Sequence, residues 1–269
     1  MASTIKLADL PNQIRLPYIE QGDSPGFPVV FLHGVAGSWR DFDLVVPRLP
    51  ASIHAFALTQ RGHGDASHPA AGYRPRDFAA DLTAFFDTLD LQKAIVAGHS
   101  MGASVALRFA VDHPDRIQGL VLVSPRASMR NRPGLLQLWE STISQLTDPF
   151  DPGFVKTFVE RSFIRQVPEA YLQTTLREAL KVPAHVWKGV FAAALEEDLL
   201  AGLDELQAPT LLVWGADDAT VPQVDRETIV AAISNSRQVV YPGVGHSPHA
   251  EDPNRFAADL AAFIGEHAS

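Results

Sequence analysis

The most informative segment of this chain is Gly98-His99-Ser100-Met101-Gly102. It directly follows an aliphatic run, Ile95 to Ala97, that predicts a buried strand, and it precedes a helical stretch, Ala103 to Val111. A serine on so sharp a turn from strand to helix has a strained backbone, and the positions beside it must be nearly free of side chain so that strand and helix can approach. Gly98 and Gly102 meet that demand. The stretch therefore predicts an exposed serine above a parallel sheet.

Ser100 lies at the predicted N-terminus of this helix. Free N–H groups and the helix dipole favour developing negative charge there, and the N–H of Met101 is a natural donor to an oxyanion. An ordinary glycine-rich turn with a capping serine would contain the same residues, and a Gly-x-Ser-x-Gly pattern often occurs by chance. A catalytic role for Ser100 therefore requires partner side chains, a base and an acid, elsewhere in the chain.

Two later strand ends offer these partners. A serine hydroxyl needs a base within hydrogen-bond reach, and a histidine base needs a carboxylate that fixes its tautomer. Asp217-Asp218 follows the strand run Leu211 to Trp214, and His246 follows the run Gln238 to Tyr241. Because carboxyl ends of parallel strands share one edge of a sheet, we expect these groups on the same edge as Ser100. The alternative to a catalytic role is that Asp217 and Asp218 form a solvated turn and that His246 is a surface loop residue.

A second glycine-rich loop, His33-Gly34-Val35-Ala36-Gly37, follows the strand run Val29 to Leu32. An oxyanion hole needs two N–H groups from different loops aimed at one point, and Val35 is the candidate for the second donor beside Met101. We expect His33 to be a structural turn residue and a helix to begin near Phe42.

Short runs of β-branched and aliphatic residues recur along the chain and alternate with segments of helical periodicity. This alternation implies right-handed crossovers and a mostly parallel sheet with helices on both faces. The apolar stripes of Phe78 to Leu89 and Phe256 to Ile264 predict two of the helices. The predicted buried strands are Val29 to Leu32, Ile53 to Leu58, Ile95 to Ala97, Leu120 to Val123, Leu211 to Trp214 and Gln238 to Tyr241.

The strand signal disappears between Arg126 and Gln207, where the chain becomes helical and rich in aromatic residues. We interpret this segment as a helical insertion. Most aromatic residues at helical spacing bury a helix against a core, so we expect only a minority of them to contact a ligand.

Composition excludes several classes of protein. Of the 269 residues, 46% are hydrophobic and 20% charged, which predicts a folded globule. The net charge of −9 and the lack of a basic run argue against nucleic acid and anionic membranes as partners. The chain has no cysteine, which excludes disulfides and thiol nucleophiles.

Residues Met1 to Asn12 lack the apolar segment of a secretory signal. No apolar run is long enough to span a bilayer, so we expect a cytoplasmic protein.

These motifs resemble the α/β-hydrolase superfamily, in particular its small, cofactor-free esterase, haloperoxidase-like and carbon–carbon hydrolase branch. The similar stretches span nearly the whole chain and occur in the family's order of serine, aspartate and histidine. One departure is Asp65-Ala66, where many relatives have a serine, and nothing catalytic depends on it. The stretches are His33-Gly34, Arg61-Gly62-His63-Gly64, Gly98-His99-Ser100-Met101-Gly102, Trp214-Gly215-Ala216-Asp217-Asp218 and Gly245-His246-Ser247.

The resemblance implies an eight-stranded, mostly parallel α/β sheet, with a helical lid inserted after the sixth strand and no cofactor. It divides the chain into a first part of the core at 1–125, a lid at 126–207 and a second part of the core at 208–269. In such families the acid comes three residues after the glycine, which selects Asp218 over Asp217. A serine at the nucleophile position argues against dehalogenases and epoxide hydrolases, which share this fold.

A cluster at His246, His249, Glu251 and Asp252 could also be interpreted as metal ligands. The simpler interpretation is a catalytic histidine followed by a polar loop, with Asp252 as a cap of the last helix. We therefore predict no metal, and a monomer or small homo-oligomer that acts on a small molecule.

Three functional hypotheses follow. The first is hydrolysis of a carboxylic ester, lactone or thioester with a hydrophobic acyl or aromatic part, through a triad of Ser100, His246 and Asp218 with Val35 and Met101 as oxyanion donors. The second uses the same triad for carbon–carbon bond hydrolysis or perhydrolysis. The third is a ligand receptor or signalling protein built on a hydrolase scaffold. The fold alone does not choose among them.

Overall fold

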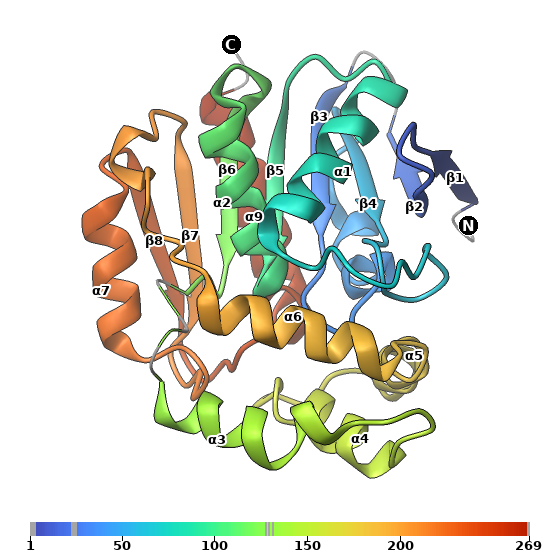
Figure 1. Cartoon of the computed structure of the whole chain (residues 1–269). Helices are drawn as coiled ribbons and strands as arrows, with labels where there is room; N and C mark the ends of the chain where they lie inside the picture. The colour runs from blue at the N-terminus through green and yellow to red at the C-terminus, as the bar shows by residue number, and fades with distance from the viewer. Residues whose placement is uncertain (1–3, 23–25, 127, 129, 131, 268–269) are drawn as a thin grey trace.

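The computed structural model describes residues 4–22, 26–126, 128, 130 and 132–267. These residues form a single eight-stranded sheet in the order β1-β2-β4-β3-β5-β6-β7-β8, flanked by helices (Figure 1). Strands β3 to β8 are parallel, and β1 and β2 are antiparallel to their neighbours, so the predicted mostly parallel sheet is confirmed. The strands are β1 (Ile5–Asp9), β2 (Arg15–Gln21), β3 (Phe27–Leu32), β4 (Ile53–Leu58), β5 (Ala94–His99), β6 (Ile117–Val123), β7 (Thr210–Gly215) and β8 (Ser236–Tyr241).

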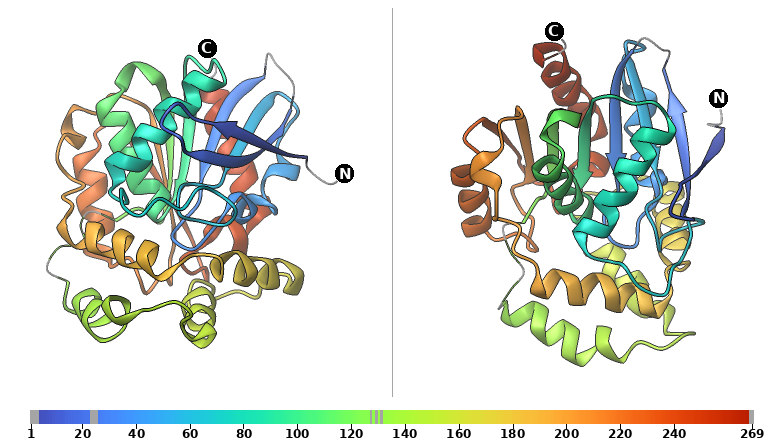
Figure 2. Two further views of the ribbon diagram at one scale, coloured as in Figure 1. Left: turned by 45° about the vertical axis from the view of Figure 1, so that its right-hand side comes forward. Right: turned by 45° about the horizontal axis from the view of Figure 1, so that its top comes forward.

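Sequence periodicity predicts six of these strands and misses β1 and β2. Strand β1 forms one edge of the sheet, and its apolar residues Ile5 and Leu7 are 49% and 56% exposed, so the strand has no buried run to detect. The prediction that Gln238 to Tyr241 is a buried strand is wrong for most of its length, because Gln238 and Val240 are exposed. Strand β8 forms the opposite edge of the sheet and pairs with β7 alone. Figure 2 shows the two edges at opposite ends of the sheet.

Helices cover both faces of the sheet and enclose two apolar cores. Helices α1 (Pro75–Thr88) and α2 (Met101–Asp112) cover one face, and α9 (Pro253–His267) covers the other. Because side chains alternate along a strand, Val96 of β5 enters the core beneath α1 and α2, and Ile95 enters the core beneath α9. Burial on both faces explains why the central strands are apolar throughout.

Four α-helices lie between β6 and β7 in the described part of the chain. Both views of Figure 2 show them together beyond the carboxyl ends of the parallel strands. Trp187 of this group is fully buried and packs against Phe154, Phe158 and Phe191. This aromatic cluster is continuous with the core beneath α1 and α2. The four helices are α3 (Pro133–Ser141), α4 (Pro152–Glu160), α5 (Glu169–Ala179) and α6 (Ala184–Glu196).

The helix expected near Phe42 is present only as two short 3-10 helices, η1 (Trp39–Phe42) and η2 (Val46–Arg48). Ser38 caps η1 by accepting a hydrogen bond from the N–H of Arg40 at 3.2 Å, and Pro47 in η2 lacks the N–H that a longer helix would need. The remaining helices are η3 (Pro114–Arg116), η4 (Ile143–Gln145), η5 (Leu203–Glu205), α7 (Gln223–Ala232) and α8 (Pro248–Glu251). In the part of the chain that the structure describes, none of the helices has the length and apolarity to cross a membrane.

Candidate active site

The serine predicted at the elbow lies between β5 and α2 in a strained backbone conformation. Ser100 has φ 51° and ψ −109°, outside the usual regions for a residue with a side chain. A Cβ atom at Gly98 would lie 2.2 Å from the carbonyl oxygen of Gly102, and one at Gly102 would lie 2.3 Å from that of Leu32. Only glycine fits at both positions, as the sequence pattern requires. The elbow is held to β6 by the N–H of Ser100, which donates to the carbonyl of Val123 at 2.9 Å.

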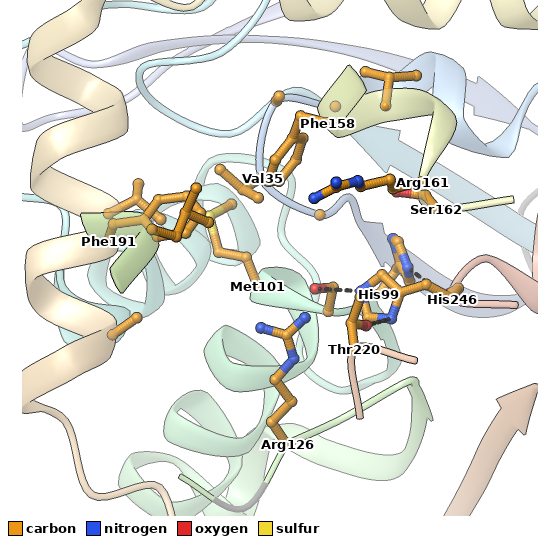
Figure 3. A pocket seen from close by; sticks show the side chains of 18 of the residues that line it. Val35, His99, Met101, Arg126, Phe158, Arg161, Ser162, Phe191, Thr220 and His246 are labelled. Atoms are coloured by element: carbon orange, nitrogen blue, oxygen red, sulfur yellow. Dashed lines mark hydrogen bonds between the residues drawn. The ribbon is translucent and has the colours of Figure 1, made fainter. Parts of the chain in front are cut away.

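A continuous chain of hydrogen bonds joins Ser100, His246 and Asp218. The hydroxyl of Ser100 lies 3.0 Å from Nε2 of His246, and Nδ1 of His246 lies 2.8 Å from Oδ2 of Asp218 (Figure 3 shows His246 at the cavity wall). His246 follows β8 and Asp218 follows β7, so the parallel sheet brings three positions far apart in sequence to one edge. Asp217, the alternative acid, is exposed to solvent.

Burial and hydrogen bonding set the charge states of the two partners. Burial alone would raise the pKa of Asp218, but hydrogen bonds from His246 and Thr220 outweigh it, and the pKa lies well below its ordinary value. Burial lowers the pKa of His246, although Asp218 partly opposes this shift. At neutral pH the pair is therefore a carboxylate beside a neutral imidazole, which is the form of histidine that can accept a proton.

Thr220 is a second hydrogen-bond partner of the Asp218 carboxylate, beside His246, and it was not among the residues predicted from sequence. Its hydroxyl donates to Oδ1 of Asp218 at 2.6 Å, and its backbone N–H donates to the same oxygen at 2.8 Å. The hydroxyl also lies 2.7 Å from Nδ1 of His246. A threonine two residues after an aspartate is typical of a turn in which the carboxylate accepts that backbone N–H, so the sequence did contain a signal.

Val35 and Met101 border the cavity beside Ser100 (Figure 3). Met101 is the first residue of α2, so its N–H has no carbonyl one turn earlier in the helix to bind. Val35 lies in a turn closed by a hydrogen bond from the N–H of Gly37 to the carbonyl of Gly34, at 3.1 Å. A Cβ atom at Gly34 would lie 3.4 Å from Cβ of Ser100, so this loop passes within contact distance of the serine.

The cavity above Ser100 has a volume of about 990 Å³. Its walls come from the sheet edge and from the helices between β6 and β7, which contribute Phe158 and Phe191 (Figure 3). Two arginines that the sequence analysis did not single out, Arg126 and Arg161, also line it. The cavity therefore combines a mainly apolar wall with cationic groups. Further apolar residues of the wall are Leu135, Leu138, Phe154, Phe163 and Val190.

Two histidines near the site make structural contacts. Nδ1 of His33 donates to the carbonyl of Gly34 at 2.7 Å, and its Nε2 accepts the N–H of Gln60 at 2.9 Å, which fixes the turn before Val35. Nε2 of His99 donates to the carbonyl of His246 at 2.9 Å. His99 thus supports the backbone at His246.

The cluster at His246, His249, Glu251 and Asp252 does not form a ligand set, because both oxygens of Glu251 accept backbone N–H groups. Among the described residues, a different buried group brings three ligand atoms within 4.8 Å of one another: Asp41, His99 and His249.

A parallel sheet that presents a serine in this backbone conformation at its carboxyl edge is the architecture of an α/β hydrolase. Comparison with known families agrees with the fold. Residues 28–253 match the family model described as alpha/beta hydrolase fold. The chain belongs to this family, and it is a hydrolase.

The chain is similar in sequence, to about the same degree, to relatives whose names indicate different reactions. The chain is 28% identical over 253 residues to a 2-hydroxymuconate semialdehyde hydrolase of Pseudomonas sp. strain CF600, covering 90% of the chain and 88% of the relative. It is 29% identical over 269 residues to a non-heme chloroperoxidase of Streptomyces lividans, covering 92% and 95%. Among solved structures, a bromoperoxidase from Bacillus anthracis superposes with a TM-score of 0.87 at 25% identity, covering 97% of this chain and 100% of that one.

Proposed function

We propose that the protein is a serine hydrolase in which Ser100 is the nucleophile, His246 the general base and Asp218 the acid that orients the base. The observation that carries this proposal is the unbroken hydrogen-bond chain from the hydroxyl of Ser100 through the imidazole to the carboxylate, at 3.0 and 2.8 Å. These are the contacts that activate a serine hydroxyl, which is otherwise a weak nucleophile.

In the proposed reaction, the oxygen of Ser100 attacks the substrate carbonyl while His246 takes the hydroxyl proton. The N–H groups of Val35 and Met101 stabilise the oxyanion of the tetrahedral intermediate. As the intermediate collapses, His246 gives its proton to the leaving alcohol or thiol and an acyl-enzyme remains. Water then attacks the acyl carbon, gives a proton to His246 and releases a carboxylic acid, and the proton returns to Ser100.

The proposed substrate is a carboxylic ester, lactone or thioester with a hydrophobic acyl or aromatic part. The size of the cavity and the aromatic residues in its wall support this class. We propose further that residues 126–207 act as a lid, because helices α3 to α6 cover the carboxyl edge where Ser100 lies and supply much of the apolar wall.

The test compares Ser100→Ala with the wild-type protein on p-nitrophenyl esters of increasing acyl length. The variant should lose up to about 10⁶-fold in kcat, the range seen when a serine is removed from a triad that acts as a unit. Turnover in the variant at the wild-type rate would refute the assignment of the nucleophile.

The second candidate function uses the same three residues for carbon–carbon bond hydrolysis or perhydrolysis. The observation in its favour is the similarity to a 2-hydroxymuconate semialdehyde hydrolase and to a non-heme chloroperoxidase. Side-by-side assays of an ester, a vinylogous diketone, and an organic acid with peroxide separate the reactions. Fast diketone cleavage with negligible ester turnover would place this candidate first.

A further inference from the structure

Glu251, the last residue of α8, joins two segments that are distant in sequence. Glu251 is only 8% exposed. Its carboxylate accepts hydrogen bonds from the loop that carries His246: the N–H of Gly245 at 3.0 Å and, more weakly, that of Ser247 at 3.4 Å. The same carboxylate accepts the N–H groups of Ile164 at 2.9 Å and Arg165 at 2.7 Å, between α4 and α5. One buried anion therefore binds four backbone donors.

Hydrogen bonds to a carboxylate are stronger than those between neutral groups, and exclusion of water strengthens them further. The segment Ser162–Arg165 and the loop Gly243–Ser247 lie outside the regular helices and strands, so their positions depend on individual hydrogen bonds. The packing is also close, since a Cβ atom at Gly245 would lie 2.9 Å from a side-chain carbon of Ile164 and 3.1 Å from Glu251. Glu251 is thus a major connection between the two segments.

The backbone of His246 takes part in the same junction. Its N–H donates to the carbonyl of Ser162 at 3.1 Å, and its carbonyl accepts from the hydroxyl of Ser124 and from His99, both at 2.9 Å. In Figure 3, Ser162 and His246 lie side by side at the cavity wall. The position of the imidazole therefore depends on the insertion as well as on the sheet.

We propose that Glu251 is a positioning residue that couples the segment Ser162–Arg165 to His246, so that the imidazole is aligned with Ser100 only while this segment is docked. The inference rests on the proposed function, because it takes His246 as the base. It adds a link between the insertion and the reacting groups, and this link makes turnover depend on the position of the insertion.

The charge of Glu251 provides a readout that separates positioning from simple structural support. The ionisable groups facing His246 are Asp218 and Glu251, which raise its pKa, Arg126, which lowers it, and the buried histidines 99 and 249. Removing the negative charge at 251 lowers the pKa of His246. Because the base must be neutral, the acid limb of kcat/KM should then move to lower pH.

The test uses Glu251→Gln and Glu251→Asp with a p-nitrophenyl ester. The amide of Glu251→Gln has one acceptor oxygen and turns an NH₂ group toward backbone donors, so kcat should fall about 10- to 100-fold, the scale of a displacement near 1 Å, with a smaller change in KM. Its acid limb should move to lower pH. Glu251→Asp keeps the charge but is too short to reach both segments, so kcat should fall while the acid limb stays nearer its wild-type position.

Glu266→Gln is the matched control, because it makes the same chemical change at an exposed carboxylate whose partner, Arg237 of β8, lies outside both segments. It removes the ion pair with Arg237 at 3.0 Å. It should retain kcat within about threefold and leave the acid limb in place, since an exposed ion pair contributes little.

A Glu251→Gln protein with wild-type kcat and an unmoved acid limb, whatever its melting temperature, would overturn the proposal. If that variant does not fold, Glu251→Asp decides: wild-type kcat overturns the proposal, and reduced kcat supports it. Failure of the proposed function has a different signature, because Ser100→Ala would then retain turnover however Glu251 behaves.

Discussion

Replacing Thr220 with valine tests how much the catalytic pair depends on a contact seen only in the structure. The substitution keeps the β-branched shape and removes one hydroxyl, which donates to Oδ1 of Asp218 at 2.6 Å. Hydrogen bonds to charged groups contribute about 1.5 to 3 kcal/mol, which corresponds to a factor of about 10 to 150 in rate if the whole contribution is lost in the transition state. The backbone N–H of residue 220 still binds Asp218, so we expect the lower end, about a tenfold loss of kcat.

The assay is steady-state turnover of a p-nitrophenyl ester by the wild-type protein, Thr220→Val and Thr220→Ser. KM should change less than kcat, because the hydroxyl donates to Asp218. Thr220→Ser restores the donor and should recover most of kcat. Equal losses in both variants, or no loss in Thr220→Val, would refute the role given to this hydroxyl.

Three further predictions concern the acid, the stability of the fold and its pH dependence. Asp218→Asn should lower kcat by about 10⁴-fold with an intact fold, since an amide cannot hold the imidazole in the required tautomer, and a loss of less than tenfold on esters would contradict this. Trp187→Ala should destabilise the protein by about 3 to 5 kcal/mol, measured by urea unfolding, because it empties a fully buried aromatic position. Burial lowers the pKa of His63 to about 4 and of His249 to about 3. These groups bind protons in the unfolded state below about pH 6.5 but not in the folded state, so the melting temperature should fall between pH 7 and pH 4, and a constant or rising value would count against buried neutral histidines.

The central sheet and the positions of the candidate residues could be predicted from sequence because each depends on a local pattern. Buried parallel strands are apolar throughout, and the carboxyl ends of such strands share one edge. These two rules place Ser100, Asp218 and His246 together. The elbow is equally local, since its geometry excludes any side chain at Gly98 and Gly102.

Features that depend on exposure or on long-range contacts could not be predicted in this way. Strand β1 is an edge strand with exposed apolar residues, so its pattern resembles that of a surface segment. The binding of Glu251 to Ile164 joins residues 87 positions apart, and nothing in the local sequence marks the pair. The spacing of His246, His249, Glu251 and Asp252 in the sequence suggests metal ligands, whereas in the structure the oxygens of Glu251 accept backbone N–H groups. The division of the chain at 126 and 207 remains a prediction.

The most direct test of the proposed triad is mass spectrometry of the protein after treatment with a fluorophosphonate probe, which reacts with activated serines and requires no knowledge of the substrate. We predict one covalent adduct per chain, located on the peptide that contains Ser100 and absent from Ser100→Ala and from His246→Ala. An unmodified protein, or an adduct on another residue that persists in both variants, would contradict the proposal that Ser100 is activated by His246.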